Sequence, residues 1–254
     1  MTWSIVARDP ETGALGVAVA SRFFAVGALV PHIRAGKGAV ATQAFVSPLW
    51  GIEAADRIAR GEAAAKITAD LVARDAGQSQ RQIHMIDAAG RSAAHTGTDC
   101  IDWAGHLIGD GVSVAGNMLA GPGVVAETLK SYQANAALPF AERLMTAMEA
   151  GEAAGGDKRG RQSAALRIHR DQDYPWLDIR ADDHADPLAE LRRLYAVAQE
   201  RFLYVAEILP TRENFSGMAD RSPIDRKIAA EEERRAKAGL PSASHASGPV
   251  TPAG

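Results

Sequence analysis

Cysteine is almost absent from this sequence: Cys100 is the only one in 254 residues. A single thiol excludes a disulfide within the chain, and it excludes a zinc site built from the cysteines of one chain. Folding therefore requires no oxidising compartment, and we expect a cytoplasmic protein. The histidines lack the spacing of known metal ligands, so we expect neither a metal ion nor an organic cofactor.

Long apolar runs and a strong excess of one charge are missing as well. No stretch has the length of a transmembrane helix, and no cationic segment followed by an apolar one marks a signal peptide. The formal net charge is −3, so no overall field favours nucleic acid or an anionic membrane as a partner. Hydrophobic residues make up 46% of the chain, which is enough to bury a substantial core.

What is present is a regular order of short strands and amphipathic helices. Ser47-Pro48 predicts a helix start, with Ser47 as the N-cap and Pro48 in the first turn. Runs rich in Val, Ile and Ala predict strands at 2–8, 14–20, 28–34, 39–45, 82–86, 91–95, 102–107, 112–117, 162–169 and 176–181. Helices are predicted from 47 to 61, 63–75, 123–134, 139–150 and 187–208. This order predicts an α+β protein built as a four-layer αββα sandwich.

The composition changes after Leu209, and we predict one folded domain over residues 2–210. In the extension 211–254, a charged helix-like stretch at 228–237 precedes a run of Pro, Ser, Ala and Gly that we expect to be disordered. The long last helix and the extension offer more surface than one compact domain needs. We therefore expect a homo-oligomer, most simply a dimer.

The start of the chain carries the strongest chemical signal. Thr2 follows Met1 directly, and methionine aminopeptidases remove Met1 when residue 2 is small. The freed α-amino group has an ordinary pKa of about 8, so it can act as a general base on the hydroxyl of the same residue. The alternative is that Thr2 is an ordinary second residue, since small residues are common there.

A second polar constellation is the loop 155–160, Gly-Gly-Asp-Lys-Arg-Gly. Its glycines let backbone N–H groups turn toward a ligand, and Lys158 and Arg159 suit a carboxylate. The alternative is a linking loop in which Asp157 pairs with Arg159 or Arg161. The Gly-Lys-Ser/Thr ending of a phosphate loop is missing.

Other candidate residues lie where predicted strands end. The Asn117 amide is a candidate to stabilise an oxyanion, or else Asn117 is a turn residue in the left-handed region. Thr42 and Gln43 come late in a strand that leads into a helix, and His95 closes a hairpin strand, so all three are candidates for substrate contacts.

The acidic run Asp182-Asp183-His184, with Asp186, has the ligand types of a hard metal ion. It also directly precedes a predicted helix, where acids satisfy exposed N–H groups and favour the helix dipole. We interpret it as a cap.

Several long segments, in order, resemble a known family. They are Thr2–Asp9, Gly16–Arg22, Gly38–Ala44, Arg81-Gln82, His95–Gly97, Trp103–His106, Gly116-Asn117, Ala154–Leu166 and Asp182–His184. On these segments the chain resembles the bacterial and archaeal DUF1028 family over roughly residues 2–200. That family is regarded as similar to the N-terminal-nucleophile (Ntn) hydrolases, so the resemblance implies their αββα fold.

The resemblance to the threonine proteases of that superfamily is partial. Their nucleophilic Thr begins the chain and their second strand ends near Ser-Arg, as at Ser21-Arg22 here, which we place at the substrate site. They have an Asp just before that pair, where this chain has Ala20. Their catalytic Lys lies on a following strand, whereas Lys37 lies in a predicted turn. Thr2 is retained, and the rest of the proteolytic apparatus is not.

Two functions remain open. The first is an amidohydrolase that cleaves a small amide, ureido or peptide-like bond, with Thr2 as nucleophile, Asn117 assisting and a small substrate carrying a carboxylate. The second is a catalytically inactive Ntn-fold protein that binds a small amino-acid or peptide-derived ligand. The substrate depends on loop conformations that the sequence does not reveal.

Overall fold

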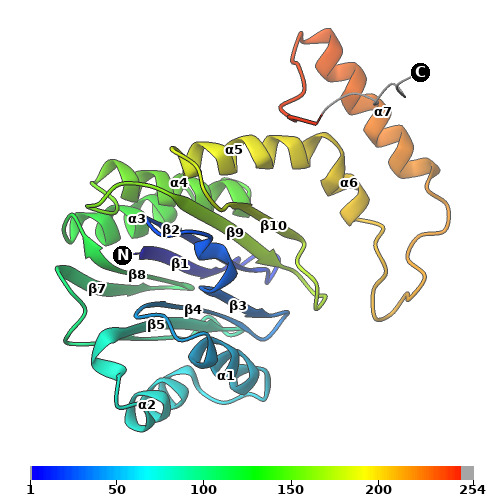
Figure 1. Cartoon of the computed structure of the whole chain (residues 1–254). Helices are drawn as coiled ribbons and strands as arrows, with labels where there is room; N and C mark the ends of the chain where they lie inside the picture. The colour runs from blue at the N-terminus through cyan, green and yellow to red at the C-terminus, as the bar shows by residue number, and fades with distance from the viewer. Residues whose placement is uncertain (1, 247–254) are drawn as a thin grey trace, which may run out of the picture. The chain divides into compact units, whose positions relative to one another are not determined.

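The computed structural model describes residues 2–246 (Figure 1). The chain divides into two compact units, of which the first ends at Leu191 and the second begins at Arg192. Within the described part of the chain, no helix combines the length and the apolar character needed to cross a membrane.

Two antiparallel sheets form the centre of the first unit. The larger has the strand order β10-β9-β2-β1-β8-β7, and the smaller has the order β3-β4-β5-β6. The strands are β1 (Thr2–Arg8), β2 (Leu15–Ser21), β3 (Pro31–Arg34), β4 (Gly38–Ala44), β5 (Arg81–Asp87), β6 (Ser92–Thr96), β7 (Trp103–Gly109), β8 (Val112–Leu119), β9 (Ser163–His169) and β10 (Leu177–Ala181). Strands β1, β2 and β8 contact β3, β4 and β5, so the sheets pack face to face.

Helices cover the two outer faces (Figure 1). α1 (Pro48–Ala59) and α2 (Ala64–Arg74) contact the smaller sheet, while α3 (Gly123–Ala134) and α4 (Phe140–Ala153) contact the larger one. The predicted start of α1 is confirmed: the Ser47 hydroxyl accepts a hydrogen bond from the backbone N–H of Trp50 at 3.3 Å, and Pro48 lies in the first turn.

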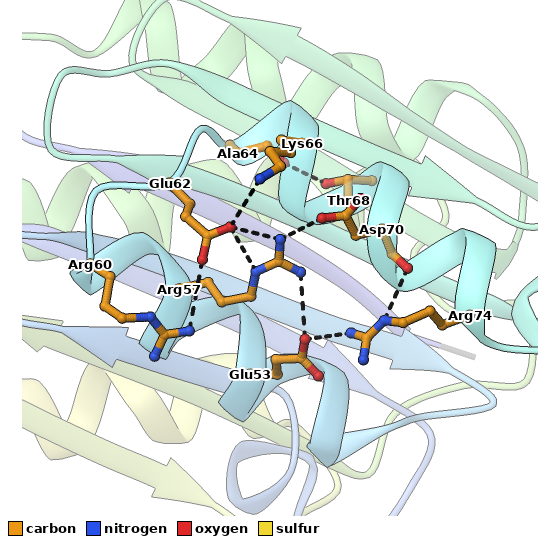
Figure 2. Close-up of polar contacts among 9 residues, drawn as sticks. All are labelled: Glu53, Arg57, Arg60, Glu62, Ala64, Lys66, Thr68, Asp70 and Arg74. Carbon is orange, nitrogen blue, oxygen red and sulfur yellow. Dashed lines mark hydrogen bonds and ion pairs between the residues drawn. The ribbon is translucent and has the colours of Figure 1, made fainter.

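Arg57 ties α1 to α2 (Figure 2). Its guanidinium lies 2.7 Å from Glu62 and 2.6 Å from Asp70, with Glu53 at 3.5 Å. Only 10% of the Arg57 side chain is exposed. Hydrogen bonds to Glu62 and Asp70 raise the pKa of Arg57, and the same bonds lower the pKa values of both carboxyl groups. The helix pair is thereby held as one unit on the smaller sheet.

The layer between the sheets has two chemically different halves. The apolar half is the buried cluster of Val6, Leu15, Val17, Val19, Val26, Val30, Ile33, Ala39, Ala41, Ile86 and Ala165. The polar half consists of Ser4, Gln43, Gln82, His84, Ser113 and Asn117, all buried and joined by hydrogen bonds that cross from one sheet to the other.

The second unit continues α5 (Pro187–Val197) through a π-helical turn (Ala198–Phe202) into α6 (Leu203–Ala206), where the sequence predicts one regular helix. α7 (Ser222–Lys237) begins six residues before the predicted charged stretch and buries Ile224 and Ile228. Ser242 and Ala243 donate hydrogen bonds to Glu200 at 2.7 Å each, so the start of the tail that we expected to be disordered is anchored. The rest of that tail, residues 247–254, lies outside the described residues.

Candidate functional site

Thr2 lies at the beginning of β1, between two other strands of the larger sheet. Ser21 of β2 is opposite it on one side and Asn117 of β8 on the other. The Thr2 Oγ1 atom is 3.0 Å from Ser21 Oγ, and Thr2 is only 7% exposed. The structure therefore brings together three residues that the sequence analysis singled out separately.

Two side-chain amides hold the main chain of Thr2, and a third joins them to each other. Asn117 Nδ2 donates to the Thr2 carbonyl at 3.3 Å, and Gln43 Nε2 does so at 3.4 Å. Both nitrogens also donate to Gln82 Oε1, at 3.1 and 2.8 Å. Gln82 Nε2 in turn donates to the Gly116 carbonyl at 2.9 Å. This amide cluster of Gln43, Gln82 and Asn117 fixes the backbone from which the Thr2 hydroxyl projects.

A buried histidine sets the orientation of Gln43. Ser4 Oγ donates to Gln43 Oε1 at 2.7 Å, so its hydroxyl oxygen accepts from the Nε2–H of His84 at 2.8 Å. His84 Nδ1 then has no proton and accepts from the Ser113 hydroxyl at 3.0 Å. Complete burial, with a smaller effect of His106, lowers the pKa of His84 to about 3. The ring is therefore neutral at physiological pH and keeps this tautomer.

A cavity of about 240 Å³ lies next to Thr2. It is lined by Thr2, Phe23, Val26, Leu29, Val30, Gln43, Ala44, Phe45 and Val46. None of these described lining residues carries a charge. A polar side chain at the wall of a mostly apolar cavity is the usual arrangement of a small-molecule site.

Unfavourable backbone conformations gather around this cavity. Ala25, Ala44 and Met118 have φ values of 51°, 69° and 53°, in the left-handed region that residues other than glycine rarely adopt. Ala44 lines the cavity, Ala25 precedes the lining residue Val26, and Met118 directly follows Asn117. Such conformations cost about 1–3 kcal/mol each and concentrate at functional sites.

The glycine-rich loop reaches the same end of the larger sheet through Asp157. This buried carboxylate accepts hydrogen bonds from the backbone N–H groups of Arg22 and Arg159, each at 2.8 Å. The Arg159 guanidinium also lies 3.4 Å from Asp157, and Lys158 pairs with Asp102 at 2.5 Å. Asp157 pairs with Arg159, as the linking-loop alternative expects, and Lys158 also has an acidic partner, while contact of this loop with a ligand stays a prediction.

Thr42 and His95 lie on the face of the smaller sheet that α1 and α2 cover. Thr42 alternates with Gln43 along β4, and its buried hydroxyl has no hydrogen-bond partner. His95 Nε2 is 3.1 Å from the Gln78 carbonyl, and its ring centroid lies 6.1 Å from that of Trp50 in α1. Neither residue joins the group around Thr2.

Gln82, Ser4 and His84 were missed by the sequence analysis. The signal available was the alternation of Gln82 and His84 along a strand that otherwise reads as apolar, which places two polar side chains on one face.

Asp186 caps α5, as the capping interpretation predicts. Its Oδ1 accepts a hydrogen bond from the N–H of Ala189 at 3.2 Å. Asp182 pairs with Arg180 at 3.1 Å, and Asp183 accepts from the Gln162 amide. Over residues 2–246, no group of three or more His, Cys, Asp and Glu side chains is arranged to hold a metal ion.

Comparison with known proteins gives a family but no activity. The model of DUF1028, a family of unknown function, matches residues 2–191. A DUF1028 protein from Silicibacter pomeroyi, known from its crystal structure, is 31% identical with a TM-score of 0.80, over 86% of this chain and 99% of that one. Anbu (ancestral beta-subunit) from Yersinia bercovieri is 11% identical with a TM-score of 0.37, over 82% of this chain and 98% of that one. The chain matches no curated protein.

Proposed function

Because the chain belongs to the DUF1028 family, whose function is unknown, we propose a function from the site itself: an amidohydrolase with Thr2 as its N-terminal nucleophile. The observation that carries this proposal is the position of the Thr2 hydroxyl. It lies beside a cavity large enough for a small substrate group, 3.0 Å from the Ser21 hydroxyl, on a main chain held by the amide cluster. The bond cleaved is a small amide, ureido or peptide-like bond.

The order of the layers supports this proposal. A helix pair, the smaller sheet, the larger sheet and a second helix pair follow one another by their contacts. We assign this order to the four-layer αββα sandwich of the Ntn hydrolases. In such a sandwich a residue that begins a strand of the central sheets presents its side chain at one end of the layer between them, where Thr2 lies.

Catalysis begins with the amine of Thr2. Once Met1 is removed, the α-amino group takes the proton of Oγ1, directly or through one water, and Oγ1 attacks the scissile carbonyl carbon. The leaving amine receives that proton as the C–N bond breaks, and water then hydrolyses the acyl ester on Thr2. Because the amine acts in its neutral form, activity rises with pH through its pKa, which is ordinarily about 8.

The backbone N–H groups of segment 44–47 stabilise the oxyanion, except that of Phe45, which donates to the Gln80 carbonyl at 3.0 Å. Three of these residues line the cavity, and the segment leads into the N-terminus of α1, whose dipole favours negative charge. Asn117 was predicted as a further oxyanion donor. In the observed geometry its amide donates to the Thr2 carbonyl and to Gln82, so we assign it the positioning of Thr2. Orientation of a substrate carboxylate by Lys158 and Arg159 stays a prediction.

The test combines intact mass with substitution of Thr2. We expect the purified protein to lack Met1, and we expect it to hydrolyse members of a panel of N-acyl amino acids, dipeptides and ureido acids. Thr2→Ala should lower kcat by about 10³-fold or more, since it removes the nucleophile. Thr2→Ser keeps a hydroxyl and should retain part of the activity.

A chain with a glutamate inserted between Met1 and Thr2 is the matched control. It keeps the Thr2 side chain but removes the free amine, so it should be as inactive as Thr2→Ala. Activity that survives in Thr2→Ala would refute the mechanism, and the nucleophile would then be sought at Ser21.

The second candidate is an inactive Ntn-fold protein that binds a small amino-acid or peptide-derived ligand. It is favoured by one observation: the side-chain amide of Asn117, which was expected to face an oxyanion, is engaged with the protein itself. Retention of Met1 in the intact mass would select this function, because it blocks the amine.

Two further expectations accompany the proposal. We propose a homo-oligomer, which light scattering would contradict by giving the monomer mass at micromolar concentration. We also propose a cytoplasmic location, because a chain with one cysteine forms no internal disulfide and so does not need an oxidising compartment to fold.

A further inference from the structure

The cavity beside Thr2 has an unusually uniform lining. Apart from Thr2 and Gln43, the described residues around it are all apolar, and they come from the segment after β2 and the segment after β4. Gln43 offers little to a ligand, since its Oε1 accepts from Ser4 and its Nε2 donates to the Thr2 carbonyl, Gln82 and the Ala115 carbonyl. The Thr2 hydroxyl is thus the polar side-chain group that the described lining presents, and in the mature protein of the proposed mechanism the α-amino group of Thr2 lies beside it.

This lining discriminates strongly by charge. A carboxylate or ammonium placed among the apolar side chains, away from the amine of Thr2, would lose its hydration and find no charged side chain among the described lining residues, which is costly. An apolar group of matching shape would instead gain free energy from leaving water. The lining therefore selects against charge at the position next to the nucleophile.

The volume of the cavity sets the size of the ligand group that can fill it. An apolar protein cavity of about 150 Å³ holds a benzene ring, and this cavity measures about 240 Å³. Phe23 and Phe45 border it while remaining 54% and 67% exposed, so their rings can cover part of a group that extends outward. A branched aliphatic chain or a single aromatic ring fits, and a small acetyl group leaves most of the space empty.

The wall formed by Phe45 is anchored from outside the cavity. Arg81 donates to the Phe45 carbonyl at 2.7 Å, and its guanidinium carbon lies 5.4 Å from the centre of the Phe45 ring. Arg81 is itself paired with Asp75 at 2.5 Å. A positioned aromatic wall of this kind gives the cavity a defined shape before a ligand arrives.

We propose that this cavity binds the acyl half of the substrate, and that the acyl group is uncharged and apolar, of the size of an isovaleryl or phenylacetyl group. This inference rests on the proposed function, in which the acyl carbon becomes bonded to Oγ1 of Thr2. The acyl group stays beside Thr2 through both steps, whereas the amine half leaves after the first. Residues 44–46 border the cavity and belong to the segment assigned to the oxyanion, so a carbonyl bound there directs its substituent into the cavity. The substrates are then N-acyl amino acids with apolar acyl groups.

The test uses the mature protein and four N-acyl alanines that share one leaving group: acetyl, isovaleryl, phenylacetyl and succinyl. We expect kcat/KM to be at least about tenfold higher for isovaleryl and phenylacetyl than for acetyl, since each methylene that fills an apolar pocket contributes about that much. Succinyl, with its carboxylate, should be the poorest. An equal rate for all four, or a preference for succinyl, would overturn the inference.

Variants locate the preference in the cavity. Val46→Trp fills the space and should abolish the advantage of the larger acyl groups, and Leu29→Trp should do the same if Val46→Trp does not fold. Leu49→Trp is the matched control, because Leu49 is 76% exposed, lies three residues further on and does not line the cavity. Val46→Lys should raise the rate for succinyl relative to phenylacetyl. An unchanged acyl profile in a folded Val46→Trp protein would also overturn the inference.

Binding separates this inference from the proposed function. If no substrate is hydrolysed, the function fails, and calorimetry with phenylacetamide and succinamate then examines the cavity alone. Binding of phenylacetamide that is lost in Val46→Trp and kept in Thr2→Ala supports an apolar ligand at this site. Absence of binding, or tighter binding of succinamate, contradicts it.

Discussion

The two halves of the layer between the sheets share strands β1, β4 and β5 but are built on opposite chemical principles. In the apolar half, Val6, Val17 and Ala41 exclude water and need only fit one another. In the polar half, Ser4, Gln82 and His84 must each meet a partner in the facing sheet, because an unsatisfied buried polar group is costly. The apolar half therefore supplies stability that tolerates small shifts, while the polar half allows one register between the sheets.

That difference explains where Thr2 is placed. The nucleophile of the proposed mechanism has to be held to within a fraction of an ångström of its working position. Directional bonds from Gln43 and Asn117 to the Thr2 carbonyl do this, and non-directional packing does not. Substitutions in each half test this contrast.

The largest effect is expected in the polar half, for Gln82→Leu. The substitution leaves Gln43, Asn117 and the Gly116 carbonyl without their partner, so the free energy of unfolding should fall by about 2–4 kcal/mol. Activity of the folded fraction should fall as well, since Thr2 loses its support. Urea unfolding and steady-state kinetics measure the two losses. Gln133→Leu, on an exposed turn of α3, is the control and should change neither.

The matching change in the apolar half is Val17→Ala. It removes two methyl groups from a fully buried site, and the cavity left behind should lower the free energy of unfolding by about 2 kcal/mol. Activity per folded molecule should stay close to that of the parent protein. A kinetic defect as large as that of Gln82→Leu would show that the two halves are not separable.

A third prediction concerns pH and His84. Burial lowers the pKa of His84 to about 3 in the folded protein, while in the unfolded chain it returns to about 6.5. At a pH between these two values, His84 is protonated in the unfolded chain but not in the folded protein. The free energy of unfolding therefore falls as the pH falls below about 6.5. The slope approaches about 1.4 kcal/mol per pH unit. Urea unfolding at pH 7, 6 and 5 measures it, and His84→Gln should remove this part of the slope.

The smallest effect is expected at the rim of the polar half, for Ala44→Gly. The left-handed conformation of Ala44 is strained, and glycine adopts it freely. Relief of strain, partly offset by the greater flexibility of glycine in the unfolded chain, should raise the free energy of unfolding by about 0.5 kcal/mol. Ala41→Gly, at a β4 position without a positive φ, should instead destabilise the protein. A loss of stability in Ala44→Gly would show that the strain is absent.

Much of the fold is predictable because its signals are local. The cap at Ser47, the bounds of α3 and the hairpin strands around residue 90 all follow from short sequence patterns that the structure confirms. The strand predicted at 28–34 is partly wrong: Val26–Ala28 form a 3₁₀ turn, and β3 begins only at Pro31. Pro31 has no N–H to donate, which suits the first residue of an edge strand.

The candidate site is only partly predictable, because it depends on pairing between distant strands. Thr2, Ser21 and Asn117 were found since each stands at the end of a predicted strand, but nothing local shows that they are neighbours. Gln82 was missed because alternation identifies a face of a strand without revealing which face meets the other sheet. The partners of Lys158 and Arg159 were open for the same reason, as ion pairs form only once the loops are in place.

The strand order of the larger sheet also determines when, during synthesis of the chain, that sheet can be completed. The strands beside Thr2 are complete once Leu119 has been made, but β2 also pairs with β9, so the larger sheet is incomplete until Ser163–His169 have been synthesised. At about 5–20 residues per second the ribosome needs roughly 10–30 s to add those roughly 160 residues. Removal of Met1, which the proposed enzyme requires, can therefore take place on a nascent chain whose larger sheet is unfinished, before Thr2 reaches the 7% exposure of the folded protein.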